Sequence, residues 1–271
     1  MTPPFALAIE SVAFWAPTLP DWPAARAAFR GEGSALNQGQ RIPTPHGLPP
    51  GERRRAPASV ALALHVGGAA ATQARRNPQD MLSVFTSAHG DLPVVDHLCS
   101  TLAHNPRLIS PTRFVHSIHN APAGVWSMLH QNRDAHAAIS AGEYSFACGL
   151  LEAALTAQTE QRPVLLVAYD TAAVGALTHT THSAAPMALA MVLRPGSPAV
   201  DQAGLRWQLA PTGASRPQPL SPQARALPPN GMSPALPWME CLAHERPTTL
   251  ELPLSPHQCL SLEYHPPHTP G

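Results

Sequence analysis

Apolar residues along this chain follow two periodicities that alternate from the N-terminus towards residue 195. Short apolar or alternating runs predict strands over residues 5–15, 81–86, 136–141, 164–169 and 185–193. Longer apolar segments with small residues predict helices over residues 58–74, 91–102, 121–129 and 145–158. Strands that alternate with helices of this length are typical of βαβ units. The pattern therefore predicts an α/β fold with a mixed, mostly parallel sheet and flanking helices.

The C-terminal part of the chain has a different pattern, because its apolar runs are short and separated by many prolines. Residues 205–210 and 249–254 predict strands, as do residues 259–264, and residues 237–243 predict a short helix. Proline-rich segments favour stiff linkers over packed elements. We therefore divide the chain into a domain of residues 1–210 and a Pro-rich linker with a small C-terminal appendage, residues 211–271.

Composition adds information about partners. The chain has 271 residues, 44% of them hydrophobic, which is enough for one substantial core. Charged residues make up 13% and the formal net charge is zero, against a charged fraction of about 25% in an average globular protein. A basic nucleic-acid-binding surface is therefore excluded. A weakly charged surface is prone to association, so we expect a protein partner.

The pattern of potential metal ligands and membrane segments excludes further classes of protein. The four cysteines are widely spaced, without a CxxC motif, and the 15 histidines form no HExxH motif. We predict neither a metal site nor a cofactor. No apolar run reaches the ~18 residues of a membrane span, and the N-terminal segment contains Glu10 and no basic residue. We therefore expect a cytoplasmic protein.

Several blocks of the sequence, in the same order, resemble the N-terminal half of a β-ketoacyl synthase. The segment RLISPTRFVHSIHN (107–120) with the following APAGVWSM (121–128) resembles one block, and HAAISAGEYSFACGLLEAAL (136–155) resembles the next. VLLVAYD (164–170) is similar to the strand that follows, and residues 81–90 and 185–193 are similar to an earlier and a later strand. The resemblance implies a thiolase-like N-terminal half, without the second half that supplies the family's two catalytic histidines.

In that family, a strand leads into a sharp turn that carries a nucleophilic cysteine, and a long buried helix follows. Counting back from Ala153 and Ala154, which match an Ala-Ala pair in the helix, places Glu143 at the position of the nucleophile. Acyl transfer needs a thiolate, so a carboxylate cannot replace it, although it can accept hydrogen bonds at a helix N-terminus. Cys148, five residues later, is interpreted as a small core residue.

With its nucleophile replaced, the chain resembles the chain-length-factor partners of ketosynthases, including short members found with aryl polyene clusters. The resemblance implies a non-catalytic partner of a ketosynthase in fatty-acid-like or aryl polyene biosynthesis, in a heterodimer or heterotetramer that also meets an acyl carrier protein. The strand of residues 137–141 would then pair with the partner. Pocket or interface candidates are His116, His119, Asn120, Trp126, Ala137, Ile139, Ala141, Glu143, Tyr144 and Phe146.

A second hypothesis is an enzyme with a different site. Glu143 beside Tyr144, with His116 or His119 within reach, could supply an acid/base pair, because such catalysis needs a carboxyl group near a histidine or tyrosine. The corresponding activity is a malonyl-carrier-protein decarboxylase or another acyl-thioester enzyme. A serine hydrolase is excluded, because the turn lacks the Gly-x-Ser-x-Gly motif.

Overall fold

The computed structural model describes residues 5–33, 39–213 and 220–267. They form one eight-stranded sheet in the order β3-β2-β4-β5-β1-β6-β8-β7. The strands are β1 (Phe5–Trp15), β2 (Leu82–Thr86), β3 (His136–Ile139), β4 (Val164–Asp170), β5 (Met187–Pro195), β6 (Ala203–Pro211), β7 (Thr248–Pro253) and β8 (Gln258–His265). The α/β fold class is confirmed, and each strand lies where the sequence pattern predicts one.

Helices join and cover these strands. The α-helices are α1 (Trp22–Phe29), α2 (Pro50–Arg53), α3 (Ala58–Gln73), α4 (Leu92–His104), α5 (Pro111–Ser117), α6 (Ala121–His130), α7 (Ser145–Glu160), α8 (Pro222–Arg225) and α9 (Leu236–His244). The short 3-10 helices are η1 (Pro78–Asp80), η2 (Pro106–Leu108), η3 (Gly142–Tyr144), η4 (Gly175–His179) and η5 (Ser233–Ala235). In the part of the chain that is described, none of these helices has the length and apolar character needed to cross a membrane.

The sheet is mixed, as expected, but parallel pairing is less common than the sequence pattern predicts. Only β2 pairs in parallel, with β3 and β4, whereas the other five strand pairs among the described residues are antiparallel. Parallel strands need a long crossover, usually a helix. The helices α4, α5 and α6 lie between β2 and its neighbour β3, and α7 lies in the connection that leads from β3 past β2 to β4. The β4–β5, β5–β6 and β7–β8 connections contain no α-helix. The prediction of a mostly parallel sheet is therefore wrong.

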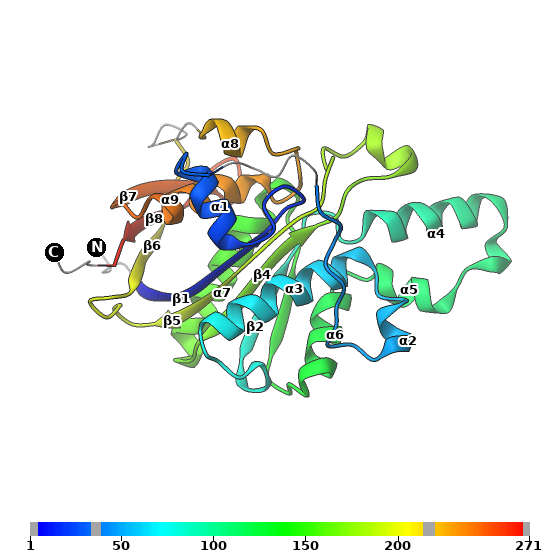
Figure 1. Cartoon of the computed structure of the whole chain (residues 1–271), viewed down its shortest axis with the longest axis horizontal. Helices are drawn as coiled ribbons and strands as arrows, with labels where there is room; N and C mark the ends of the chain where they lie inside the picture. The colour runs from blue at the N-terminus through cyan, green and yellow to red at the C-terminus, as the bar shows by residue number, and fades with distance from the viewer. Residues whose placement is uncertain (1–4, 34–38, 214–219, 268–271) are drawn as a thin grey trace.

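Two hydrophobic clusters lie on opposite faces of the sheet. The helices α3 and α6 cover one face, and α7 covers the other together with α1 and α9 (Figure 1). All seven residues of β4 are buried, and alternate side chains enter alternate clusters: Leu165 and Val167 join one, while Leu166 and Ala168 join the other. A continuous apolar run in β4 is what burial on both faces requires.

The C-terminal residues extend the same sheet. β6 pairs with β1 and β8, and β7 forms the edge beyond β8. Trp238 of α9 is completely buried in the cluster that also contains α7 residues. The Asn230 side chain donates hydrogen bonds to the backbone carbonyls of Asp170 (3.2 Å) and Ala185 (2.6 Å). The residues expected as an appendage are thus bonded and packed into the sheet and core.

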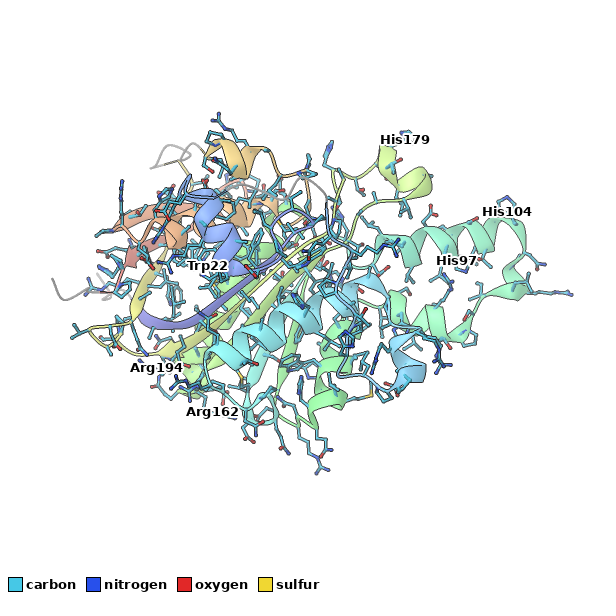
Figure 2. The ribbon with its side chains drawn as sticks, in the orientation of Figure 1. Trp22, His97, His104, Arg162, His179 and Arg194 are labelled. Carbon is cyan, nitrogen blue, oxygen red and sulfur yellow. The ribbon has the colours of Figure 1, made fainter. Side chains whose placement is uncertain are left out.

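At the opposite end, α4, η2 and α5 (residues 92–117) protrude from the sheet (Figure 1). We call this segment, together with Ile118, the apolar arm. His97 and His104 of α4 are exposed (Figure 2). Large apolar side chains are exposed as well, namely Leu102, Leu108, Phe114, Val115 and Ile118. Such a concentration of exposed apolar side chains is typical of a surface that another molecule covers.

Candidate functional site

The strand-to-helix turn expected to carry the functional residue lies between β3 and α7. Gly142 has φ of +57°, a left-handed conformation that glycine adopts without strain. The Ser145 hydroxyl donates to the Gly142 carbonyl (2.7 Å) and accepts from the Ala141 N–H (2.9 Å). The Thr86 hydroxyl of β2 donates to the Ser145 carbonyl at 2.7 Å. These bonds fix the turn and hold the start of α7 against the sheet.

Glu143 is exposed at this turn, in η3 and two residues before α7. A small cavity of about 130 Å³ adjoins it, lined by Glu143, Tyr144, Phe146, Ala147, Pro234, Leu252 and Pro253. Burial raises the pKa of Tyr144, and its hydrogen bond with Glu143 acts in the same direction. The cavity is well below the ~300–1,000 Å³ of typical small-molecule sites. The C-terminal elements η5 and β7 therefore leave little space beside Glu143.

Cys148 lies within α7, where its side chain is partly buried. Burial raises the pKa of its thiol, so the thiol form predominates at neutral pH. A nucleophilic cysteine needs the opposite, a lowered pKa that yields the thiolate. This environment supports the interpretation of Cys148 as a packing residue.

The two candidate histidines and Asn120 do not line the cavity at Glu143. A ring nitrogen of His119, Nε2, lies 2.9 Å from the Ser87 carbonyl. His116 lies on α5, where burial lowers the pKa of its imidazole. Asn120 is exposed and precedes α6 without a capping bond from its side chain. The structure therefore does not bring an imidazole into the cavity beside Glu143.

Trp126 and Phe146 lie on opposite faces of the sheet. Trp126 is buried in the cluster of α3 and α6, with its ring centroid 6.3 Å from that of Phe85. Phe146 is buried in the cluster of α7 and contacts the Glu143 cavity. The sheet separates the two side chains, so a single tunnel within this chain does not contain both.

The strand β3, which contains Ala137 and Ile139, is an edge of the sheet. It pairs only with β2 among the described residues. The carbonyls of Ala135 and Ile139 accept hydrogen bonds from the N–H groups of Ser83 and Ser87. Backbone groups alternate in direction along a strand, so those of Ala137 also face β2. The N–H and C=O groups of Ala138 face away from the sheet, while Ala141 follows at the turn.

Sequence reasoning did not identify two buried carboxylates, one at the end of β4 and one before α4. Asp170 accepts hydrogen bonds from the Ser87 hydroxyl (2.7 Å) and from the N–H groups of Ala88 (2.9 Å) and His89 (3.0 Å). Burial nevertheless raises its pKa, against the effect of these bonds. Asp91 accepts from the N–H groups of Ser59 and Val94. One carboxylate thus caps both α3 and α4 and fixes the base of the apolar arm.

The position of Asp91 directly before an apolar helix is typical of an N-cap residue, so its bond to Val94 could be predicted from the sequence. Its second partner, Ser59, is distant in sequence and could not. The sequence also shows an acidic residue, Asp170, after the apolar run of β4, but it does not show which three groups donate hydrogen bonds to it. Within the described ranges, no group of three or more His, Cys, Asp or Glu side chains is arranged to hold a metal ion.

Comparisons with known proteins bear on the family and the fold of this chain. Residues 27–251 match the family model described as "Beta-ketoacyl synthase, N-terminal domain". No curated protein sequence matches the chain. Among solved structures, it is similar to a chain in the complex of a ketosynthase with its chain length factor from Xenorhabdus doucetiae. The TM-score is 0.71 with 22% identity, and the match covers 95% of this chain and 99% of the other.

Two further solved structures are similar over nearly their whole matched chains. One is the ishigamide ketosynthase/chain length factor, with a TM-score of 0.68, 13% identity, and coverage of 96% of this chain and 99% of the other. The second is a type II polyketide synthase acyl-carrier protein in complex with its ketosynthase bound to the hexaketide. There the TM-score is 0.71, the identity 10%, and the coverage 97% and 99%. At these identities the likeness shows a shared fold.

Proposed function

The chain belongs to the β-ketoacyl synthase N-terminal domain family, and from this premise we propose that it is a non-catalytic, chain-length-factor-like partner of a β-ketoacyl-carrier-protein synthase. In this role it completes the ketosynthase assembly while the partner subunit performs the condensation on carrier-bound substrates. We propose fatty-acid-like or aryl polyene biosynthesis as the context, on the basis of the replaced nucleophile.

The observation that carries the proposal is Glu143 at the turn between β3 and α7. A carboxylate at this position leaves the turn without the thiolate that acyl transfer requires. The adjoining cavity of about 130 Å³ is bounded on one side by Pro234, Leu252 and Pro253 from the same chain. It has no room for an acyl chain with its thioester. Both features support a role that does not include binding the substrate covalently.

The surface beside this turn supports a protein partner. β3 is an unpaired edge in the described part of the chain, and an unpaired edge favours pairing with another strand. The apolar arm carries Phe114 and Val115, which are 59% and 57% exposed. We propose that a ketosynthase covers the arm and pairs with β3. Contact with a second protein would exclude water from the apolar side chains of the arm and would give the free backbone groups of β3 hydrogen-bond partners.

The test is co-expression with the ketosynthase encoded nearest to this chain, followed by size-exclusion chromatography with mass determination. We expect a stable one-to-one or two-to-two complex. The Glu143→Gln variant should assemble equally well and support the same condensation rate to within about twofold, because an exposed side chain outside the chemistry contributes little. Glu143→Gln removes the charge and keeps the shape.

Two results would contradict the proposed partner role. If the isolated wild-type chain releases CO2 from malonyl carrier protein and Glu143→Gln does not, the acid/base hypothesis replaces the partner hypothesis. If no complex forms and no CO2 is released, the proposed function is wrong.

A backbone substitution tests strand pairing with the partner. Ala138→Pro removes an N–H that faces away from β2, and proline is tolerated on the free side of an edge strand. We expect the free chain to keep its Tm, while binding of the ketosynthase weakens about tenfold or more through the lost hydrogen bond and the inserted ring. Calorimetric titration measures the change.

The neighbouring residue provides the matched control. Ala137→Pro removes an N–H that faces β2 and should lower the Tm of the free chain, because proline disrupts a ladder bond. If Ala138→Pro binds the ketosynthase as the wild type does, β3 does not pair with the partner.

A further inference from the structure

A groove of about 540 Å³ lies on the face of the sheet opposite the Glu143 cavity. Its walls come from the loop before α3 and from α2, α5 and α6, which lie near one another in Figure 1. The lining residues are Gly47, Leu48, Pro49, Glu52, Arg55, Ala56, Val60, Thr112, His116, Val125, Met128 and Leu129. This volume is within the ~300–1,000 Å³ range of small-molecule sites.

The floor of the groove is apolar and well built. Leu48 and Val60 are 4% and 0% exposed and belong to the same cluster as Trp126. Leu129 packs against this cluster from α6. Gly47 approaches Leu129 so closely that a Cβ at position 47 would lie 3.3 Å from the Leu129 Cδ2. The loop is therefore seated on the helix, and the groove is a fixed feature of the packing.

The neighbouring arginines of the loop have different roles. The Arg53 guanidinium donates to the backbone carbonyls of Leu48 (2.9 Å) and His46 (3.0 Å), and so fixes the loop. Arg55 lines the groove, and no carboxylate lies within ion-pair distance of it among the described residues. Arg55 is therefore free to bind an anionic group.

Two further polar residues, both on α5, line the same space. His116 Nδ1 is inaccessible to solvent and has no hydrogen-bond partner among the described residues. Because water in the groove does not reach this atom, a ligand can bond it only after the imidazole rotates, and the bond then satisfies a buried polar atom that otherwise costs free energy. The Thr112 hydroxyl lines the groove one helical turn away. Arg55, Thr112 and His116 are three potential donors, against a single carboxylate, that of the exposed Glu52.

We propose that this groove binds an aliphatic monocarboxylic acid of medium chain length. Its carboxylate lies against Arg55 and accepts hydrogen bonds from Thr112 and His116, while its chain covers Leu48, Val60 and Leu129. Arginine is suited to this role, because its planar fork matches a carboxylate. Glu52 at the rim disfavours a second negative charge on the ligand, which restricts the class to monoacids. Thr112 and His116 belong to α5 of the apolar arm, so the groove borders the surface proposed for the ketosynthase, and its binding is tested on the chain without that partner.

The experiment is calorimetric titration of the full chain with sodium octanoate, with octylamine and 1-octanol as headgroup controls and acetate as a chain control. We expect one octanoate per chain, with octylamine and acetate binding at least tenfold more weakly. Arg55→Gln should weaken octanoate binding at least about fivefold, since hydrogen bonds to charged groups are the stronger ones.

Thr112→Trp, which places an indole in the groove, should abolish binding. Ala103→Trp, at an exposed position of α4 outside the groove, is the matched control and should bind octanoate as the wild type does. Each variant is first checked for an unchanged Tm.

Three outcomes overturn the proposal. One is octylamine binding as tightly as octanoate, because Glu52 would then hold the headgroup. Another is octanoate binding that Thr112→Trp leaves unchanged but Phe114→Ser abolishes, because the ligand would then lie on the exposed apolar side chains of the arm and outside the groove. The third is no saturable binding of octanoate to the folded chain.

Discussion

Phe114→Asp is expected to weaken the complex with the ketosynthase at least about 100-fold, because it places an unpaired charge in a desolvated interface. Phe114 is 59% exposed on α5, beside the equally exposed Val115. The free chain should keep its Tm, since an aspartate at an exposed helical position breaks no core contact. Calorimetry gives the affinity, and thermal unfolding of the free chain gives the Tm.

Val200 provides the matched control for this substitution. It is 73% exposed in the loop between β5 and β6, outside the apolar arm. Val200→Asp introduces the same charge in place of an exposed apolar side chain, so it should bind the ketosynthase with wild-type affinity. Equal weakening by both substitutions would indicate a general effect of charge. Wild-type affinity of Phe114→Asp would show that the arm is not the interface.

The positions of the elements followed from the sequence because hydrophobic periodicity is a local property. The apolar run from Val164 to Tyr169 predicted a strand, and β4 is a strand whose residues are all buried. Asp21 directly precedes α1, and its carboxylate accepts from the Ala24 N–H at 2.8 Å, a helix cap that involves residues three positions apart. Each of these signals involves residues within a few positions of one another.

Features that depend on distant residues could not be obtained in this way. Strand direction depends on which strands become neighbours, so the share of parallel pairing was overestimated. The C-terminal strands carried the correct pattern, but no local signal showed that Asn230 would bind the carbonyls beyond β4. Arg53 and Arg55 are indistinguishable in sequence, and only the fold shows that one fixes the loop while the other lines the groove.

The turn at Glu143 depends on the close approach of α7 to β2, and Gly149→Ala is expected to disrupt that approach. A Cβ at position 149 would lie 2.7 Å from the Thr86 Cβ and Cγ2. Both elements are central to the core, so neither can move freely. We expect a loss of about 3 kcal/mol in the free energy of unfolding, from overpacking and from the strained hydrogen bond between Thr86 and Ser145. Urea unfolding measures this loss.

Two other helical glycines make the comparison quantitative. A Cβ at Gly68 of α3 or at Gly124 of α6 would have no atom within 4 Å beyond its own helix backbone. There the same change should stabilise the chain by about 0.5–1 kcal/mol, because alanine favours the helix. If Gly149→Ala also stabilises the chain, then α7 is not held against β2 as described. Since α7 begins two residues after Glu143, the position of that carboxylate would then be in error as well.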